Sequence, residues 1–173
     1  MAEKFEFKVI EVKRVAKAVE GGKRIKVRAV VVAGNLQGKV GIGVAKGDDI
    51  ALAVEKARRL AEKNTTNTPL IEGTVPFEIE NKFGATKILL KPAKKGRGLI
   101  AGNVVRTVLS LAGYTDVSAK ILGVTKNPLV NALATIKTLE KLNKIYEKKL
   151  KLKTLINKEN ASTPDKVQIE EEK

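Results

Sequence analysis

The chain has no cysteine, no histidine and no tryptophan among its 173 residues, and it has four phenylalanines and two tyrosines. Without cysteine there is no disulfide framework, and without cysteine and histidine the usual zinc site cannot be built. Ser-His-Asp and Cys-His catalysis are excluded for the same reason. So few aromatic rings also argue against a protein that binds single strands by base stacking. These absences favour a binding protein over an enzyme.

Acidic residues are scarce relative to basic ones. The chain has 34 Lys and Arg against 19 Asp and Glu, which is a formal net charge of +15. Such an excess indicates a polyanionic partner, with nucleic acid first and an anionic membrane surface second. The alternative is that the positive charge only keeps the chain soluble. The excess belongs to residues 1–145, because residues 146–173 hold seven basic and six acidic residues.

Long apolar runs are missing as well. The first twenty residues lack the apolar stretch of a signal peptide. No segment approaches the roughly 18 apolar residues that a membrane span needs. We therefore expect a cytosolic or organelle-matrix protein with no membrane partner.

Alternation of apolar and polar residues predicts three strands in the first half, at 5–16, 25–33 and 39–45. Helical spacing of apolar residues from Ile50 to Ala61 predicts a helix that follows them. Aspartates at positions 48 and 49 suit its N-terminus. Three antiparallel strands and one helix make a small domain, which we place at residues 1–68.

The second half is predicted as another small domain, at residues 69–146. A polar segment without periodicity, 64–69 (NTTNTP), indicates a linker before it. The expected strands are 74–80, 84–92 and 114–123, and the expected helices are 100–112 and one that starts at Asn127-Pro128. The fold class is therefore α+β, with two domains. Residues 147–173 are predicted to be a charged, disordered tail.

The first candidate site is the hairpin of the first two strands, where acids are nearly absent. A tight turn at paired glycines would gather its cations along a projecting ribbon that can lie along phosphates. The alternative is a solvated sheet edge protected by lysine. The residues expected to contact RNA are Lys13, Arg14, Lys17, Gly21, Gly22, Lys23, Arg24, Lys26 and Arg28.

The second candidate is the acid-free segment 82–97, which ends in the basic glycine-rich loop 93–98 (AKKGRG). Because this loop leads towards a predicted helix, its N–H groups and the helix dipole would face an anion. One interpretation is RNA phosphate contact; the other is the nucleotide loop of a small-molecule kinase, although G-x-x-x-x-G-K-S/T is absent. The cations concerned are Lys87, Lys91, Lys94, Lys95 and Arg97.

Glycines at 41 and 43 imitate the start of a dinucleotide fingerprint, but they lie inside a predicted strand and not at a strand-to-helix turn. We interpret Gly41 and Gly43 as sites of close packing. No cofactor is expected.

A series of motifs runs along both halves. The first half contains Arg14-Val15-Ala16-Lys17, Gly21-Gly22-Lys23, and Gly38-Lys39-Val40-Gly41-Ile42-Gly43 with Lys46. The second contains Lys91-Pro92-Ala93, Gly96-Arg97-Gly98-Leu99-Ile100-Ala101-Gly102, Val105-Arg106-Thr107-Val108-Leu109, Leu111-Ala112-Gly113 and Asn127-Pro128-Leu129. In this order and spacing, the chain resembles small-subunit ribosomal protein five of the bacterial and organellar type.

The resemblance implies an N-terminal domain like a double-stranded-RNA-binding domain and a C-terminal β-α-β-α domain in two layers. It implies a structural role in the small ribosomal subunit, binding to small-subunit ribosomal RNA, and a place near the mRNA entry channel. Proteins three, four and eight of that subunit would be neighbours. A free chaperone for structured RNA remains the alternative.

The resemblance also assigns particular residues. It adds Lys46 to the RNA contacts, and it implies an effect on decoding accuracy through protein four. The residues on the protein-four side would be Gly98, Gly102, Asn103 and Arg106. The chain departs from the family pattern at Asp48, Val130 and Leu133, among other positions, so no RNA contact is assigned to these three.

Overall fold

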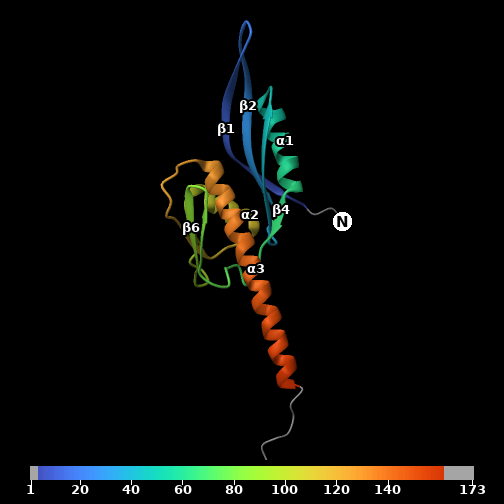
Figure 1. Cartoon of the computed structure of the whole chain (residues 1–173), viewed down its shortest axis with the longest axis vertical. Helices are drawn as coiled ribbons and strands as arrows, with labels where there is room; N and C mark the ends of the chain where they lie inside the picture. Colours follow the sequence, from blue (N-terminus) through green and yellow to red (C-terminus); the bar gives the residue numbers. More distant parts are fainter. Residues whose placement is uncertain (1–3, 162–173) are drawn as a thin grey trace, which may run out of the picture.

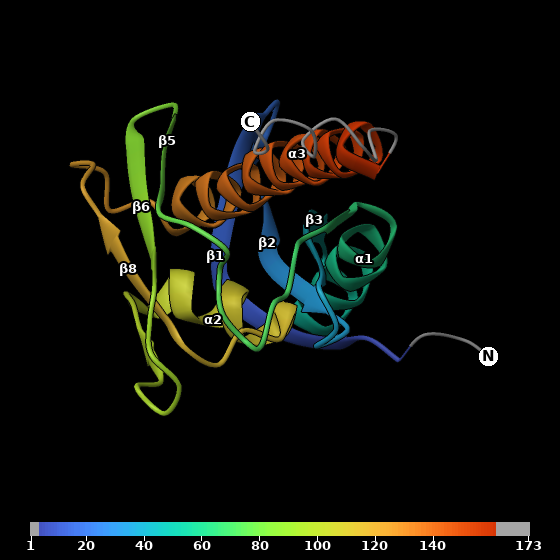
Figure 2. The same cartoon turned by 90° about the horizontal axis from the view of Figure 1, so that it is seen from below.

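The computed structural model describes residues 4–161, and side chains as far as residue 154. In chain order its elements are β1 (Glu6–Val19), β2 (Gly22–Gly34), β3 (Lys39–Gly47), α1 (Ile50–Lys63), β4 (Thr65–Asn67), β5 (Ile79–Phe83), β6 (Thr86–Pro92), β7 (Leu99–Ile100), α2 (Asn103–Ala112), β8 (Val117–Ile121) and α3 (Pro128–Ala161). They form four layers: α1, the first sheet, the pair α2 and α3, and the second sheet (Figures 1 and 2). The predicted α+β class is confirmed.

The first sheet has the order β1-β2-β3-β4 and is antiparallel throughout. Its fourth strand was not expected, because residues 65–67 were predicted to be part of a linker. They pair instead with Lys39, Val40 and Gly41 at the open edge of β3. Threonine has a high strand propensity, but three residues are too short to show the alternation by which strands are recognised.

The second half of strand β2, from Val27 on, is largely buried on both faces. Val27, Ala29 and Val31 pack against Ala53 and Ala57 of α1. The next residue along, Val32, belongs to the larger core, which also contains α2 and α3 side chains. The strand therefore forms a wall between two cores, which explains why its second face becomes apolar towards its end.

Glycines in β3 allow α1 to lie very close to the sheet. A Cβ atom on Gly43 would be 2.0 Å from the Ala57 carbonyl oxygen, and one on Gly41 would be 2.2 Å from that of Ala61. The alanines on the facing side of α1 are fully buried. The interpretation of Gly41 and Gly43 as close-packing positions is confirmed.

The second sheet has the order β5-β6-β8-β7, and β7 runs parallel to β8. Two predicted boundaries move. The strand expected from residue 74 begins at Ile79, since Pro76 cannot donate to a strand ladder. The helix expected from residue 100 begins at Asn103, because Leu99 and Ile100 pair with β8. Helix α2 ends at Gly113 in the left-handed conformation, as predicted.

Helix α3 begins as predicted but ends much later. It starts at Pro128, and the Asn127 Oδ1 atom accepts a hydrogen bond from the Leu129 amide at 3.1 Å. The helix then continues to Ala161, so the prediction of disorder is wrong for residues 147–161. Lysine and leucine are good helix formers, and the Lys149 ammonium lies 4.3 Å from the centre of the Phe77 ring. The remaining residues of the predicted tail, 162–173, lie outside the described residues.

The two halves are locked together by backbone contacts. The Leu36 amide donates to the Leu111 carbonyl at 3.1 Å, and the Gly38 amide donates to the Ala112 carbonyl at 2.8 Å. The Tyr114 hydroxyl, at the end of α2, donates to the Pro69 carbonyl at 2.9 Å, and burial raises the pKa of Tyr114 to about 12. These bonds hold the first sheet at a fixed angle to the helices of the second half.

At Gly113 the contact between the two halves of the chain leaves no room for a side chain. Its φ is +97°, and a Cβ atom would lie 2.1 Å from the Leu36 carbonyl oxygen. Gly96 is a matched comparison, because its φ is +84° but nothing lies within 4 Å of its Cβ position.

We predict that Gly96→Ala lowers the free energy of unfolding by about 1 kcal/mol through backbone strain alone. Gly113→Ala should cost about 1–3 kcal/mol more through overpacking. Urea unfolding measures the loss of stability in both variants. Equal losses would contradict the close contact between Gly113 and Leu36.

Candidate nucleic-acid interface

The β1–β2 hairpin projects beyond the rest of the sheet (Figure 1). Pairing between β2 and β3 stops at Val27 and Gly47, so residues 15–19 and 22–26 pair only with each other. Five residues of strand span about 16 Å. At the tip, Gly21 has a φ of +85°, and space is open around the Cβ positions of both turn glycines. The hairpin is therefore a narrow ribbon whose turn has one exposed side chain, that of Glu20, beside two glycines that another backbone can approach.

Cross-strand register decides which cations share a face. Opposed residues of an antiparallel pair point to the same side of the sheet. Lys17 opposes Arg24, Lys13 opposes Arg28, and Arg28 in turn opposes Lys46 on β3. The resulting surface, named here the basic face, consists of Lys13, Lys17, Arg24, Lys26, Arg28 and Lys46.

The structure does not bring all of the predicted hairpin cations together. Arg14 opposes Val27, and Lys23 opposes Ala18. Val27 packs on α1, so Arg14 and Lys23 lie on the face of the sheet that carries α1. Both side chains are exposed. The hairpin thus has one face with most of its cations and one with two.

A bulge in β1 creates this distribution. Val9 pairs with Val31, but Glu11 pairs with Val30, so Ile10 is an extra residue. Before the bulge, odd-numbered residues such as Phe7 face α1, where the Arg58 guanidinium lies 4.9 Å from the ring centre. After it, odd-numbered residues face the other side, because one added residue reverses the alternation. The bulge therefore puts Lys13 and Lys17 on the basic face.

Acidic groups neutralise one end of the basic face. Glu11 binds Lys13 at 2.7 Å and Arg28 at 3.2 Å, so these three residues together carry a single positive charge. Asp48 reaches Lys26 at 3.2 Å, an ion pair that the sequence did not predict. Nothing acidic in residues 4–154 lies within ion-pair distance of Lys17, Arg24 or Lys46. The unpaired positive charge of the basic face is therefore carried by Lys17 and Arg24 on the hairpin and by Lys46 on β3.

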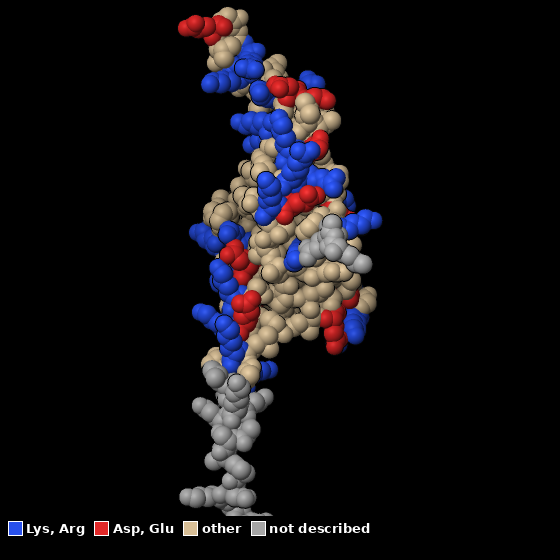
Figure 3. Space-filling view, turned by 90° about the vertical axis from the view of Figure 1, so that its right-hand side faces the viewer, with Lys and Arg blue, Asp and Glu red and all other residues tan. Residues whose placement is uncertain are grey.

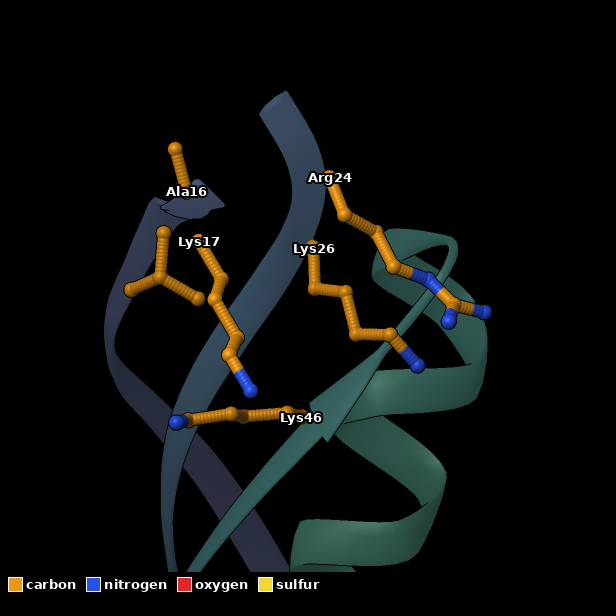
Figure 4. Close-up of a pocket in the computed structure, with 6 residues that line it drawn as sticks. Ala16, Lys17, Arg24, Lys26 and Lys46 are labelled. Carbon is orange, nitrogen blue, oxygen red and sulfur yellow. The ribbon is translucent and has the colours of Figure 1, made fainter. Parts of the chain in front are cut away.

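A groove lies among these unpaired cations. It has a volume of about 270 Å³ and is lined by Val15, Ala16, Lys17, Arg24, Lys26 and Lys46. Figure 4 shows the side chains of Lys17 and Lys46 extending towards each other, while Arg24 and Lys26 extend from β2 in another direction. Figure 3 shows Lys and Arg gathered along this end of the molecule. Four cations around one groove make a site for a phosphate chain.

The glycine-rich loop already holds an anion from the protein itself. The Gly98 amide donates to the Asp116 Oδ1 atom at 2.7 Å, and Asp116 is buried, with 8% of its surface exposed. Bonds from the amide of Gly98, then from Thr115 and from the amides of Gly96 and Arg97, lower the pKa of Asp116. The loop amides are therefore turned inwards, and helix α2 starts five residues later, at Asn103. This geometry contradicts a nucleotide-phosphate loop, whose amides must face the ligand.

The second group of predicted cations is acid-free in sequence but not in space. Lys91 binds Glu78 at 3.1 Å and Lys95 binds Glu72 at 3.0 Å, while Lys87 pairs with Glu80 on the neighbouring strand. Among the residues described, Lys94 and Arg97 have no acidic partner. Because most of these charges are compensated locally, this surface is a weaker anion site than the hairpin.

The residues assigned to the protein-four side lie together at the start of α2. Gly102 is the N-cap, and its carbonyl accepts the Arg106 amide at 2.8 Å. Asn103 and Arg106 are three residues apart on one helix face, and both are exposed. Gly98 lies at the neighbouring loop. Gly102, Asn103 and Arg106 form one exposed corner with a single cation, while Gly98 is partly buried.

This fold and this site define a basic binding protein. Within residues 4–161, no group of three or more His, Cys, Asp and Glu side chains is placed to hold a metal ion. Over the same range, no helix has the length and apolarity needed to cross a bilayer. The glycine-rich loop 93–98, which could suggest the phosphate loop of a kinase, already binds the carboxylate of Asp116.

Comparison with known proteins identifies the family. The model of the ribosomal protein S5 N-terminal domain matches residues 5–69, and that of the ribosomal protein S5 C-terminal domain matches residues 81–151. The chain belongs to the ribosomal protein S5 family, whose members are structural and not enzymes. The predicted resemblance is confirmed.

Individual relatives are similar over most of their length. Small ribosomal subunit protein uS5 of Thermus thermophilus is 48% identical over 138 residues, covering 80% of this chain and 85% of the relative. The uS5 of Thermotoga maritima is 45% identical, covering 81% and 78%. Small ribosomal subunit protein uS5c of Cyanidium caldarium is 46% identical, covering 79% and 81%.

The hydrogen bonds to Asp116 give the protein a defined response to acid. A carboxylate with a lowered pKa adds stability above its unfolded pKa of about 4, and this stability is lost as the pH falls towards the folded pKa. We predict that Asp116→Asn is less stable than the wild type at pH 7, and that the difference shrinks as the pH falls below 4. Urea unfolding at several pH values measures it. A difference that stays constant with pH would show that Asp116 acts by packing alone.

Proposed function

We propose that this chain binds small-subunit ribosomal RNA through the basic face of its hairpin. One observation carries the proposal: the register of β1, β2 and β3 puts six cations on one face of the sheet, and this face continues onto the projecting hairpin. Relatives at 45–48% identity bear the name small ribosomal subunit protein, which supports ribosomal RNA as the polyanion.

The mechanism of binding is electrostatic and geometric. Lys17, Arg24 and Lys46 would neutralise phosphates and release condensed counterions. The turn glycines, Gly21 and Gly22, would let the hairpin backbone come close to RNA. Lysine and arginine read the position of phosphates more than base identity, so recognition would depend on the shape of a folded RNA segment.

The place of the chain in the subunit is also a proposal. We propose that it lies near the mRNA entry channel beside ribosomal proteins three, four and eight, as the family resemblance implies. Its contribution to decoding accuracy would pass through the exposed corner at Gly102, Asn103 and Arg106. Exposure of the first turn of α2 supports this assignment, because these side chains are free to meet another protein.

Charge removal on the two faces of the hairpin tests the RNA proposal. The full chain with a small-subunit ribosomal RNA transcript should lose affinity by about 10³–10⁵-fold between 50 and 200 mM salt if 6–10 phosphates are bound. We predict that Lys17→Ala with Arg24→Ala reduces the slope of log affinity against log salt by about two. Arg14→Ala with Lys23→Ala removes the same charge from the other face and should reduce it less.

Control measurements separate binding from folding and from a free chaperone role. Both double variants alter exposed side chains, so their urea unfolding curves should match the wild type. Equal slopes for the wild type and Lys17→Ala with Arg24→Ala would contradict the basic face. In a sedimentation gradient of cell extract, the protein should travel with the small subunit; a protein found only in light fractions would support the chaperone alternative.

A separate variant tests the accuracy proposal. Arg106→Leu removes the cation from the exposed corner while keeping a helix-forming residue. We predict that cells carrying it assemble small subunits normally but show a changed rate of misreading in a reporter with a near-cognate codon. Ser110→Leu, an exposed change one helical turn further along α2, is the control. Misreading rates that match the wild type in Arg106→Leu cells would count against this role.

A further inference from the structure

We propose that helix α3 carries a second RNA-binding surface, a line of lysines on its exposed side that binds the phosphates of a different RNA segment from the hairpin. This inference rests on the proposed RNA-binding function and extends it along α3, as far as residues 147–151, where the sequence predicted a disordered tail. The surface, named here the lysine stripe, consists of Lys137, Lys141, Lys144, Lys148 and Lys151.

The spacing of these lysines follows the helix. Steps of four, three, four and three residues keep all five within an arc of about 80° on a helix with 3.6 residues per turn. Over 14 residues the stripe is about 21 Å long. The buried side chains of Leu139 and Leu142 lie on the opposite side of the helix, in the core. The stripe is therefore directed away from the protein, and all five lysines are exposed.

Charge increases along the stripe towards the projecting end of α3. Glu140 accepts hydrogen bonds from Lys137 at 2.8 Å and Lys144 at 2.9 Å, and they lower its pKa to about 2. Lys141 donates to the Asn81 amide oxygen at 3.4 Å. Lys148 and Lys151 have no acidic partner in the part of the chain described with side chains. The strongest anion site on the helix is therefore beyond Lys144.

The middle of α3 contacts the segment before β5 on another side of the helix. Pro76 and Phe77 form a groove with Tyr146, Lys149 and Leu150. The Lys149 ammonium lies over the Phe77 ring. These contacts stiffen α3 just where Lys148 projects, so its charges are presented at fixed spacing, which reduces the entropy lost on binding.

The composition of α3 favours RNA over an anionic membrane. A helix that lies on a membrane inserts an apolar face next to its cations. Here Leu139 and Leu142 are buried in the core. The large apolar side chains that α3 exposes within residues 128–154, Leu150 and Leu152, are two residues apart and therefore lie on nearly opposite sides of the helix. A row of evenly spaced cations without a continuous exposed apolar face is complementary to a phosphate chain.

The hairpin projects from one end of the molecule, and α3, which carries the stripe, runs past the body towards the opposite end (Figure 1). In Figure 3 basic side chains, with acidic ones among them, continue down the molecule as far as its grey part. The shared core keeps the two surfaces at a fixed separation. The protein would therefore bridge two RNA segments and set the distance between them.

Two charge-matched variants test the stripe. Lys148→Gln with Lys151→Gln removes two stripe lysines, and Lys126→Gln with Lys153→Gln removes two exposed lysines outside the stripe. Glutamine keeps helix propensity, and circular dichroism would verify it. In the RNA titration described above, the stripe variant should reduce the salt slope by about two, and the control should leave it nearly unchanged. Equal slopes in stripe variant and wild type would overturn the inference.

The hairpin variant makes this failure distinguishable from failure of the proposed function. If Lys17→Ala with Arg24→Ala weakens RNA binding while the stripe variant does not, the proposed function stands and the stripe is wrong. If the wild type itself shows no salt-dependent RNA binding, both fail. Vesicles of phosphatidylcholine and phosphatidylglycerol are the second probe: stripe-dependent binding to vesicles, with RNA binding unchanged, would also overturn the inference.

Tethered cleavage tests the bridging geometry directly. Because the chain has no cysteine, single cysteines can be introduced at exposed positions for attachment of Fe-EDTA. Glu147→Cys would report on the stripe and Ala18→Cys on the hairpin, in small subunits reconstituted with the full chain. We expect cuts in two separate segments of the ribosomal RNA. No cuts from Glu147→Cys, or the same cuts from both positions, would overturn the proposal.

Discussion

The structure depends on the second half of strand β2 being buried on both faces. Val27, Ala29 and Val31 close the small core beneath α1, while Val32 on the other face joins the core formed with α2 and α3. A strand in this position cannot slip by one residue, because a slip would exchange the two sets of side chains. Every other placement follows from it: α1 on one side, the second half on the other, and the hairpin continuing in line with the strand.

The same constraint explains why charge is organised as it is. Ile10, the extra residue in β1, packs against the shared core, and this insertion reverses the facing of all later β1 residues. Lys13 and Lys17 therefore join Arg24 and Arg28 instead of facing α1. At the other end of the molecule, the core holds the beginning of α3 and leaves its lysines outside. The distance between the two cationic surfaces is set by packing, with no flexible hinge required.

Local charge in the sequence is a poor guide to local charge in space. The segment 82–97 contains no acid, but Glu72, Glu78 and Glu80 come back to pair with its lysines. Its glycine-rich loop has the composition of an anion site, and the anion is the buried carboxylate of Asp116. Conversely, residues 146–173 are nearly neutral on average, although Lys148 and Lys151 stand without acidic partners on an ordered helix.

The sequence alone determined the α+β class, the three main strands and α1, the cap at Asn127, the stop at Gly113 and the richness of the hairpin in cations. Each of these depends on a local period of apolar residues, on local composition or on the conformational preference of a single residue. It could also have revealed the lysine stripe, whose helical spacing is visible in the sequence. Only the tertiary structure decided which cations share a face, since that depends on one bulged residue. Only the fold placed Glu78, Glu80 and Asp116 beside distant lysines and amides, because those contacts join residues far apart in the chain.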